Sequence, residues 1–435
     1  MMVDGQIKTA TRIVRRTAED SVQHVSADIC VVGAGISGVS AALEAARLGR
    51  KVALVDGLPA LGGQAVNSII GIFCGIFSNG TKPYQFTHGI ATDILRDLGN
   101  AGALHYRGAP YNVVMYDEIA LSRWIEEAIR KAGITVILGA VLRGVVMDGR
   151  RVTALELATR YGDVRLSATG FVDATGDAAL VWQAGLPCRE PADGTVYGSQ
   201  MMVLEGVDES KYPDRDKITE RIRDKAPEYG LIRRDGFAFI HPGRGTALVN
   251  MTHVETPLEP VAASAKALEG KEQADRTLAF LKSEFPEAFG NAKVRAYGFP
   301  GIRQTRWIVG KRQLTVDDVR NGTKFDDAIA RTAWPIELHD RAEGYIWEPF
   351  SDDHVHYVPL GSLTPPDADN LVAAGRCIDG DLAALSSVRV MGPCIAMGAA
   401  AAHALDMAGT NSVHDIDVKQ LQARLHHNLE SKVYL

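Results

Sequence analysis

Three closely spaced glycines are the first residues in the chain that indicate a chemical function. Gly33, Gly35 and Gly38 follow an apolar run at residues 29–32 and begin a stretch with apolar residues at helical spacing. In such a pattern the first glycine permits a tight turn, the second lets the backbone approach a pyrophosphate, and the third lets the helix press on the sheet. The N–H groups at the helix start then face the phosphates. The spacing predicts a dinucleotide site, with an ordinary glycine-rich turn as the alternative.

An acidic residue farther along the chain supports this prediction. Asp56 ends a second apolar run at residues 52–55, about 20 residues after the glycine turn, where a carboxylate can accept hydrogen bonds from ribose hydroxyls. The glycines alone would be weak evidence. Together with two flanking strands and the acid, they make dinucleotide binding the favoured interpretation.

Two arginines have the spacing of an anion clamp. Arg303 and Arg306 are three residues apart, so on a helix they would share one face. Their planar guanidinium groups suit bidentate binding of a carboxylate. We expect them to hold an anionic substrate, and a salt bridge to a lid over the site or to a cofactor phosphate is the alternative. For Arg389 we leave substrate contact and structural pairing equally open.

The remaining catalytic candidates are single residues. A histidine is the usual general base, and His241, His354 and His356 fall in the region before the last segment of the chain, where Tyr357 follows them. His241 and Tyr357 are our candidates for proton transfer. Cys74 lies in an apolar stretch and is better explained as an inert buried thiol than as a reactive one.

The composition limits the class of protein. Of 435 residues, 46% are hydrophobic and 23% are charged, which is enough apolar material for two or three cored domains. The formal charge of −6 offers no basic surface for nucleic acid. Five cysteines without a CxxC pair favour a reduced, cytoplasmic protein with no structural zinc site. The N-terminus lacks the apolar core of a signal peptide.

Strands must position these residues. We expect buried strands at residues 29–32, 52–55, 135–138, 171–173 and 370–374, and an antiparallel meander at residues 141–147, 152–157 and 164–168.

Two helices and one loop complete this part of the prediction. Asp117 should cap an amphipathic helix whose apolar positions are Ile119, Leu121, Trp124, Ile125 and Ile129. The apolar stretch at residues 390–408 is interrupted by glycine and proline, which favours a buried helix over a membrane span. Gly62 and Gly63 predict a loop.

The order of these elements predicts a discontinuous domain. The short apolar runs that are typical of buried strands stop near residue 189 and return at residue 370. We expect an α/β fold, in which residues 25–189 and 356–435 form a Rossmann-like domain with a parallel sheet and a β-meander. Residues 190–355 would form an inserted α+β lid domain for the substrate.

Six ordered motifs resemble those of a known family. They are "VVGAGISG", "LGGQA", "DATGD", "GIRQTRWIVG", "VPLGSL" and "NLVAAGR…SSVRVMGPC". In this order they resemble the FAD-dependent oxidoreductases of the fumarate reductase-like superfamily, which has a glutathione reductase-type FAD-binding domain. The resemblance spans roughly residues 28–408.

The resemblance implies FAD as cofactor and a set of residues that bind it. They are Gly33, Ala34, Gly35, Ile36, Ser37 and Gly38 at the pyrophosphate, Asp56 at the ribose, Gly62, Gly63 and Gln64 towards the flavin ring, Ala174, Thr175, Gly176 and Asp177 near the adenosine, Gly375 and Arg376 near the ribityl and phosphate groups, and Gly392, Pro393 and Cys394 at a helix start facing flavin O2. It also implies that the arginine clamp lies over the flavin.

Two features depart from the family pattern. Glu is more usual at the position of Asp56, and Asp381 and Leu382 stand where a Thr-His pair is common, which leaves the catalytic base open. In addition, no histidine occurs in the loop after Asp56 where covalent flavin links are made, so we expect non-covalent FAD.

The function expected from this resemblance is hydride transfer between FAD and a small, anionic organic substrate, by a dehydrogenase or oxidase with an electron acceptor that the sequence does not identify. Three alternatives stay open: an electron-transfer or scaffold flavoprotein, an NAD-dependent dehydrogenase, and a monooxygenase. No second GxGxxG follows a strand, which disfavours a pyridine-nucleotide reductase. We expect no nucleic-acid partner and no membrane span, and a homo-oligomer is left open.

Overall fold

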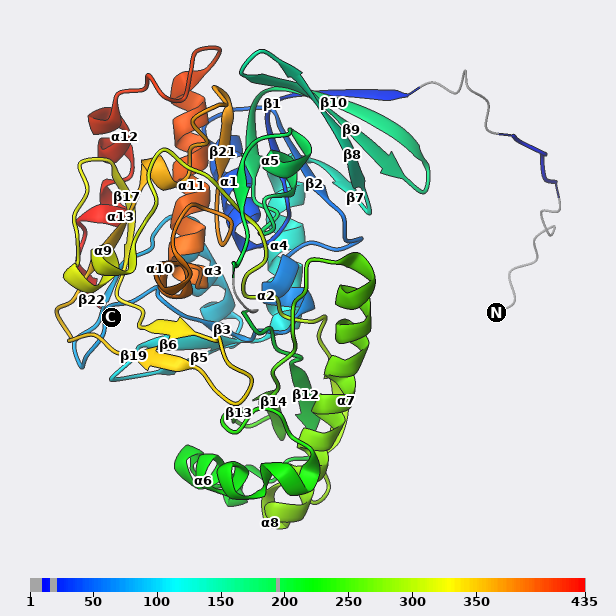
Figure 1. Cartoon of the computed structure of the whole chain (residues 1–435), viewed down its shortest axis with the longest axis vertical. Coiled ribbons are helices and arrows are strands. Elements are labelled where there is room, and N and C mark those ends of the chain that lie inside the picture. The colour runs from blue at the N-terminus through cyan, green and yellow to red at the C-terminus, as the bar shows by residue number, and fades with distance from the viewer. Residues whose placement is uncertain (1–9, 16–21, 193–195, 435) are drawn as a thin grey trace.

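A seven-stranded sheet forms the centre of the computed structural model, which describes residues 10–15, 22–192 and 196–434 (Figure 1). The N-terminal segment, for which we expect no signal peptide, lies mostly outside the described residues. The strand order is β7 (Thr135–Leu138), β2 (Val52–Asp56), β1 (Gln23–Val32), β10 (Gly162–Asp173), β9 (Arg151–Thr159) and β8 (Val141–Asp148), and β21 (Leu371–Ala373) pairs with the end of β10. β7, β2, β1, β10 and β21 are parallel, whereas β8 and β9 form an antiparallel meander with β10. The predicted α/β fold with a parallel sheet and a meander is confirmed.

β10 joins the meander to the parallel part of the sheet. The sequence predicts separate strands at residues 164–168 and 171–173, but β10 is one continuous strand. Its first half pairs with β9, and Phe171, Val172 and Asp173 pair with β21. The prediction that the segment near residue 370 rejoins the first sheet is therefore confirmed.

The expected burial of β7 is wrong. Thr135 is exposed and Val136 is 37% exposed, because β7 pairs only with β2 and forms the edge of the sheet. An apolar run of four residues does not distinguish an edge strand from a central one.

Helices α1 (Ile36–Arg47) and α11 (Met391–Ala408) pack side by side next to the sheet (Figure 1). The Ser40 hydroxyl donates to the carbonyl of Ile395 at 2.7 Å. Fifteen residues of α11 are buried, which confirms the predicted buried helix. Among the described helices, none is by itself long and apolar enough to span a membrane, and α10 (Leu382–Val388) and α11, bent by 90° between them, meet that test only as a pair.

Helix α4 (Glu118–Lys131) begins as predicted at Asp117, whose side chain accepts a hydrogen bond from the N–H of Ala120 at 2.8 Å. Leu121, Ile125 and Ile129 are buried. Ile119 is 54% exposed, so its predicted place on the buried face is wrong.

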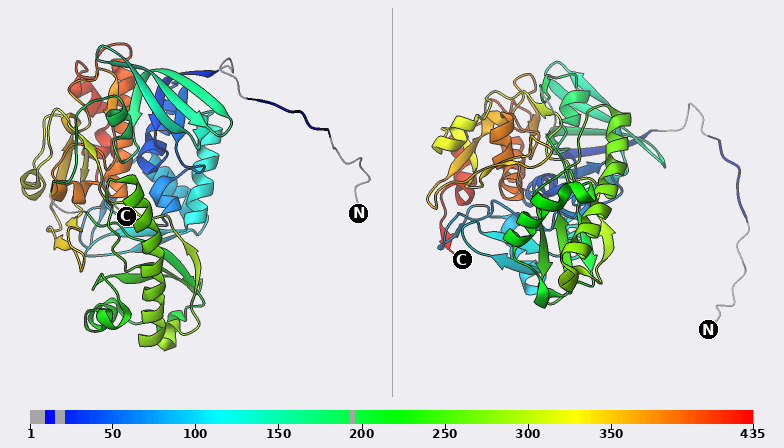
Figure 2. Two further views of the ribbon diagram at one scale, coloured as in Figure 1. Left: turned by 45° about the vertical axis from the view of Figure 1, so that its right-hand side comes forward. Right: turned by 60° about the horizontal axis from the view of Figure 1, so that its bottom comes forward.

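A second, smaller core lies in the middle of the chain. Strands β13 (Phe237–His241), β14 (Thr246–Asn250), β12 (Met202–Glu205) and β15 (Lys293–Tyr297) form a sheet in this order, and α6 (Arg215–Lys225), α7 (Pro260–Glu284) and α8 (Pro286–Phe289) lie beside it. Figure 2 shows these elements projecting from the rest of the molecule. The buried side chains of this core run from residue 202 to residue 292.

Residues after 300 belong to the larger core. Trp307, Ile308 and Leu314 are buried in the same cluster as the central sheet. We therefore propose that the insert is narrower than residues 190–355 and ends near residue 300.

Short elements surround the central sheet. They are α2 (Gly63–Asn67), α3 (Ile90–Asn100), α5 (Ala179–Gln183), α9 (Val316–Asn321), α12 (Val418–Arg424) and α13 (His426–Leu429), with the strand sets β3 (Ile72–Phe73), β6 (Val113–Tyr116) and β5 (Leu104–Arg107), β4 (Tyr84–Gln85) and β22 (Val433–Tyr434), β11 (Cys188–Arg189) and β16 (Trp307–Ile308), β17 (Ala328–Thr332) and β20 (His356–Pro359), and β18 (Ile336–Leu338) and β19 (Ile346–Glu348). Helix α2 directly follows Gly62, so the predicted loop there is only the entry to a short helix.

Candidate active site

A cavity of about 1350 Å³ lies at the carboxyl ends of the parallel strands. Val32, Asp56, Ala174 and Ala374, which end or directly follow β1, β2, β10 and β21, line it. Open α/β sheets bind ligands at this edge. The volume exceeds the 300–1,000 Å³ or so of an ordinary small-molecule pocket, so it can hold a large cofactor together with a substrate.

Most of the predicted cofactor residues line this cavity. Those on its surface are Gly33, Gly35, Ile36, Ser37, Asp56, Gly63, Gln64, Ala174, Thr175, Gly176, Asp177, Gly375, Arg376 and Cys394. Ala34, Gly38, Gly62, Gly392 and Pro393 are not on its surface. Binding by these residues remains a prediction, but the fold brings their segments together.

The three glycines of the first turn have different surroundings. A Cβ on Gly33, whose φ is +102°, would lie 2.3 Å from the carbonyl oxygen of Ala174, and one on Gly38 would lie 1.8 Å from that of Gly33. A Cβ on Gly35 would meet nothing within 4 Å. Gly33 and Gly38 therefore serve close packing, whereas Gly35 faces open space in the cavity.

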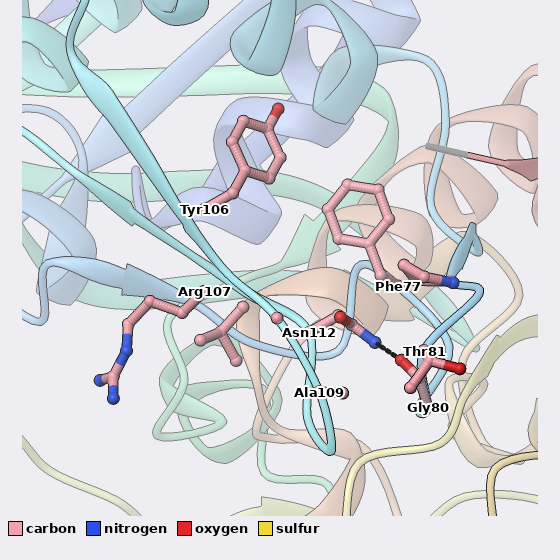
Figure 3. A pocket seen from close by; sticks show the side chains of 10 residues that line it. Phe77, Gly80, Thr81, Tyr106, Arg107, Ala109 and Asn112 are labelled. Carbon is pink, nitrogen blue, oxygen red and sulfur yellow. Dashed lines mark hydrogen bonds between the residues drawn. The ribbon is translucent and has the colours of Figure 1, made fainter.

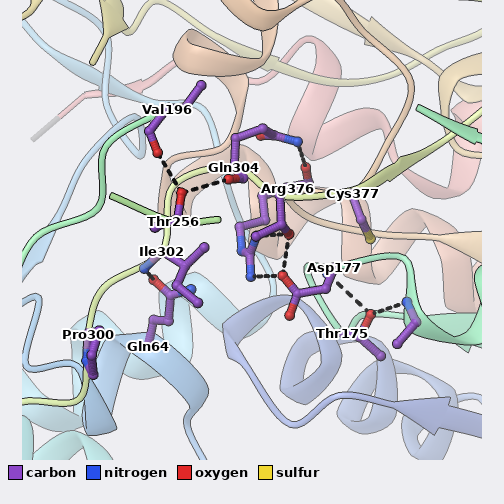
Figure 4. A network of polar contacts seen from close by, with 12 residues as sticks. Gln64, Thr175, Asp177, Val196, Thr256, Pro300, Ile302, Gln304, Arg376 and Cys377 are labelled. Atoms are coloured by element: carbon purple, nitrogen blue, oxygen red, sulfur yellow. Dashed lines mark hydrogen bonds and ion pairs between the residues drawn. The ribbon is translucent and has the colours of Figure 1, made fainter. Parts of the chain in front are cut away.

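An ion pair connects two of the strand ends (Figure 4). Arg376 Nη2 donates to Asp177 Oδ1 at 2.7 Å, and the Thr305 hydroxyl donates to the same carboxylate. Gln304 Nε2 donates to the carbonyl of Arg376 at 3.3 Å. This network fixes the end of β10 against the segment after β21.

The same network reaches the segment that carries Arg303. Gln64 Oε1 accepts a hydrogen bond from the N–H of Ile302 at 3.1 Å. Gln64, in the first turn of α2, thus holds the backbone next to Arg303 in place.

Arg303 and Arg306 do not form the predicted clamp. Residues 302–306 are not helical, so the two side chains do not share a face. Arg306 pairs with Glu190, Nη2 to Oε1 at 2.8 Å, and its guanidinium lies 4.0 Å from the ring centre of Trp182. Although Arg306 borders the cavity, the alternative of an internal ion pair is the one that the structure shows.

Arg303 and Arg389 are two of the arginines that line the cavity, and neither forms an ion pair among the described residues. Arg303 donates to the carbonyl of Tyr197 at 2.6 Å and to the hydroxyl of Ser199 at 2.9 Å. Arg389 Nη2 donates to the carbonyl of Glu337 at 3.1 Å, and its buried Nε has no hydrogen-bond partner among the described residues. Burial lowers the pKa of both guanidinium groups.

His241 and Tyr357 do not line the cavity. Phe237 and Phe239 of β13 do, but His241 ends this strand, where its ring lies 3.4 Å from the Thr246 hydroxyl. The ring of Tyr357 lies 5.8 Å from the Lys324 ammonium group. The structure therefore does not bring His241 and Tyr357 to the cavity, and their catalytic role stays a prediction.

An aromatic wall of the cavity, made of Tyr111, Trp334, Tyr345 and Trp347, was not predicted from the sequence. Trp347 packs edge-to-face on Tyr111, Trp334 and Tyr345, with ring centres 5.1, 5.8 and 6.1 Å apart. Three of the four residues fall in the stretch 334–347. Since only 7% of the chain is aromatic, this local concentration was a signal.

A smaller pocket of about 330 Å³ adjoins the main cavity and shares Arg107, Gly108, Ala109 and Val113 with it. Figure 3 shows Phe77 and Tyr106 on its wall and the hydrogen bond from Asn112 Nδ2 to the carbonyl of Gly80, at 2.9 Å. None of the predicted cofactor residues lines it.

A family model described as FAD dependent oxidoreductase matches residues 28–425. The chain belongs to this family. Its cofactor is therefore FAD, and the interpretation as an NAD-dependent dehydrogenase is wrong.

The individual proteins that this chain resembles have low sequence identity to it. Thiamine thiazole synthase of Saccharolobus solfataricus is 28% identical over 222 residues, which cover 47% of this chain and 78% of the relative. The synthase of Pyrococcus horikoshii is 24% identical over 205 residues, 44% of this chain and 76% of the relative. A geranylgeranyl bacteriochlorophyll reductase-like protein from Thermoplasma acidophilum superposes with a TM-score of 0.48 at 14% identity, covering 94% of this chain and 93% of the other.

The residues of this oxidoreductase around the first turn fit the diphosphate of FAD. Gly35 precedes α1 and has no side chain that could cap it. The buried hydroxyl of Ser37, on the cavity surface, has no hydrogen-bond partner within the described part of the chain. A phosphate at this helix start would accept from that hydroxyl and from the backbone N–H groups.

Asp56 also fits its predicted partner. Its Oδ2 accepts from the N–H of Ala34 at 2.5 Å and its Oδ1 from the N–H of Leu58 at 2.7 Å, while burial raises its pKa. A carboxylate oxygen has two acceptor sites. The group can therefore hold the glycine turn and still accept from ribose hydroxyls of FAD.

The start of α11 offers FAD fewer donors than the resemblance implies. The N–H of Gly392 donates to the carbonyl of Cys74 at 2.9 Å, Pro393 has no N–H, and the N–H of Cys394 donates to the carbonyl of Val390 at 3.2 Å. Met391, which lines the cavity, supplies the remaining N–H of this turn. Stabilisation of the flavin here would come from one N–H and the helix dipole.

Proposed function

We propose that this oxidoreductase transfers hydride between non-covalently bound FAD and a small organic anion with a planar apolar body. FAD supplies the hydride acceptor or donor, and the protein supplies position and charge. Arg303 and Arg389 would bind the anionic group of the substrate. The aromatic wall would bind its body.

The buried Arg389 guanidinium carries this proposal. Neither Arg303 nor Arg389 forms an ion pair within the described residues, although both are half-buried and removing a charge from water is costly. The charge of Glu337 acts on both guanidinium groups and offsets only part of this cost. An anionic ligand in the cavity would offset this cost and satisfy Arg389 Nε.

The aromatic wall supports the second half of the proposal. Ring faces and edges favour a flat, apolar body over a sugar or a flexible polar chain. Phe237 and Phe239 add two further rings to the cavity surface, and Arg215 and Arg107 lie over them at 4.5 and 5.1 Å. These two arginines therefore already make cation–π contacts within the protein.

The first test is an anaerobic screen of aromatic and aliphatic carboxylates for bleaching of the flavin absorbance. At least one aromatic carboxylate should reduce the flavin, or reoxidise it after chemical reduction. If no compound reacts in either direction, the protein is an electron-transfer or scaffold flavoprotein and this proposal fails.

Arg389→Met and Arg303→Met then test the anion site. A hydrogen bond to a charged partner contributes about 1.5–3 kcal/mol, so each variant should use the substrate roughly 10- to 150-fold less well. FAD content should not change. Arg341→Met is the matched control, because Arg341 is exposed and pairs with Asp340. Loss of FAD would assign the arginine to the cofactor, and full activity of both variants would contradict the anion site.

The cellular location is a separate question. All five cysteines are unpaired, which supports a reducing compartment such as the cytoplasm.

A further inference from the structure

The hairpin of β18 and β19 brings two rings of the aromatic wall, Tyr345 and Trp347, to the cavity. Its strands have three residues each, and within the described part of the chain they pair only with one another. Such a short two-stranded ribbon has little stability of its own. Of the loop residues 339–345, only His339 is buried, so this loop has no apolar core. Its position therefore depends on contacts with other segments.

The base of the hairpin is held by the larger core. Arg320 pairs with Glu348 at the end of β19, Nη2 to Oε2 at 2.7 Å. Arg389 Nη2 donates to the carbonyl of Glu337 in β18 at 3.1 Å. These contacts do not reach the loop between the two strands.

The loop is held instead by the middle of the chain, which supplies one donor to each of three backbone carbonyls. The pairs are Tyr197 N–H to His339 at 2.8 Å, His253 Nδ1–H to Ala342 at 2.8 Å and Arg234 N–H to Glu343 at 2.7 Å. Two of the donors are main-chain N–H groups, which a substitution leaves in place. The third is the side chain of His253, so this residue is where the sequence of the insert acts on the loop.

His253, between β14 and α7, also contacts a side chain of the loop. Its Nε2 lies 2.8 Å from His339 Nδ1, and both rings are at most 1% exposed. Because the Ala342 carbonyl can only accept, His253 Nδ1 carries a proton, and burial, which lowers the pKa of His253, keeps the ring neutral. Nε2 is then an acceptor for His339 Nδ1–H. His339 can present this N–H with one proton on its ring or with two, so the contact does not depend on its charge.

His339 in turn supports the aromatic wall. Its ring stacks on Tyr345, with ring centres 4.7 Å apart and an angle of 22° between the planes. The Arg233 guanidinium also lies over the Tyr345 ring, at 5.5 Å. Tyr345 packs on Trp347. A continuous set of contacts thus leads from His253 to the two wall rings of the hairpin.

We propose that His253 is a positioning residue that sets the specificity of the cavity for a planar substrate. His253 does not line the cavity. It holds the loop 339–345, and through it Tyr345 and Trp347, at the place where these rings contact the body of the substrate. The inference rests on the function proposed above, which assigns this body to the aromatic wall.

His253→Met and His253→Gln test the inference in the holoenzyme as a matched pair of similar length. The Gln side-chain oxygen can take the place of Nε2 and accept from His339, whereas the Met thioether is only a weak acceptor. Without substrate, the near-ultraviolet circular dichroism of the aromatic rings should weaken in His253→Met and persist in His253→Gln. The visible circular dichroism of the flavin and the FAD content should stay the same in both.

The substrate dependence of flavin reduction gives the second readout. With an aromatic carboxylate from the screen, the dissociation constant should rise roughly 5- to 50-fold in His253→Met, because two ring contacts are weakened. The limiting rate should change by less than about threefold, as expected when only binding is lost. An aliphatic carboxylate of the same charge, measured as a competitor, should bind as in the wild type. His253→Gln should recover most of the affinity.

Thr277→Val is the matched control for a general loss of stability. Thr277 is buried in α7, donates to the carbonyl of Gln273 at 2.9 Å and does not line the cavity. The variant removes a buried hydrogen bond from the same part of the chain and should leave the dichroism and the dissociation constant unchanged. His253→Asn is a milder variant, in which the amide can donate to Ala342 but is too short to reach His339. It should show a smaller loss in the same direction as His253→Met.

Two results would overturn the inference without affecting the proposed function. One is a His253→Met protein with wild-type aromatic dichroism and wild-type affinity. The other is an equal loss of affinity for aromatic and aliphatic carboxylates, since positioning of the wall acts on the ring contacts alone. A screen without any substrate would instead remove the proposed function, and the aromatic dichroism of His253→Met would then decide by itself whether His253 holds the loop.

Discussion

At the scale of single residues, substitutions of Gly35 and Gly38 distinguish a role in cofactor binding from a role in folding. The backbone at Gly35 has φ −69° and ψ 177°, which any residue can adopt, and a side chain there would project into open cavity space. Gly35→Val should therefore fold but exclude the FAD phosphates. The expected result is a colourless protein with a normal far-UV circular dichroism spectrum, measured together with the FAD released by acid.

Gly38→Ala should have the opposite effect. Its Cβ would lie 1.8 Å from the carbonyl oxygen of Gly33, so α1 could not keep its place against the strand. We expect little folded protein, as measured by soluble yield and circular dichroism. Gly99→Ala in α3 is the control, because the nearest atom to its Cβ is 3.9 Å away. A folded Gly38→Ala protein with full FAD content would contradict the packing role.

The residues that sequence could predict are those whose surroundings are local. Gly33, Gly35 and Gly38 act within one turn, so their spacing sufficed. Arg306 pairs with Glu190, 116 positions away, and although an ion pair was one of the two interpretations, its partner could not be identified from the sequence.

At the scale of elements, Asp117 has two functions. One carboxylate oxygen caps α4 by accepting from Ala120, and the other pairs with Arg244, in the turn between β13 and β14. Asp117→Ala should lower the free energy of unfolding by about 1 kcal/mol through the cap, with a smaller loss from the partly exposed ion pair.

Asp117→Asn distinguishes the contribution of the helix cap from that of the ion pair, because asparagine also caps helices but carries no charge. It should lose only the smaller ion-pair contribution. Urea denaturation of both FAD-saturated variants measures the difference. Equal losses in the two variants would show that the cap does not contribute.

Elements were predictable where their pattern has one interpretation. The cap at Asp117, the meander and the return near residue 370 follow from turn residues and apolar runs. The helix assumed for Arg303 and Arg306 failed, because a spacing of three residues fits a helix but does not establish one. β7 lies at the edge because no described strand pairs with its other side. Residues 135–138 alone do not show whether such a second neighbour exists.

At the scale of the whole molecule, residues that follow the central sheet and residues from the middle of the chain together line the cavity. Residues 202–292 pack on their own core, and residues 301–306 return beside Gln64 to the larger one. The pattern of buried strands predicted this interruption. It could not predict where the insert ends, because residues after 300 alternate short strands and loops whose burial depends on the central sheet.

Buried histidines make the stability of the whole molecule depend on pH. His354 Nε2 lies 3.1 Å from His356 Nδ1, His356 Nε2 lies 2.9 Å from the Ser387 hydroxyl, and this hydroxyl donates to the carbonyl of Trp334 at 2.5 Å. A neutral His356 satisfies this row. Burial, with a smaller effect of His354, lowers the pKa of His356 from 6.5 to about 3.

The direction of the pH effect follows from this shift. Between pH 6.5 and about 3 the unfolded chain binds a proton at His356 that the folded protein does not bind, so the free energy of unfolding falls as the pH falls. The contribution is about 1.4 kcal/mol for each pH unit. His356→Gln removes it, so the stability gap between wild type and variant should narrow by about 2 kcal/mol from pH 6.5 to pH 5. Urea denaturation of both FAD-saturated proteins measures the gap, and His105→Gln, at an exposed position, should show no such narrowing. A gap that stays constant with pH would show that His356 is protonated in the folded protein as readily as in the unfolded chain.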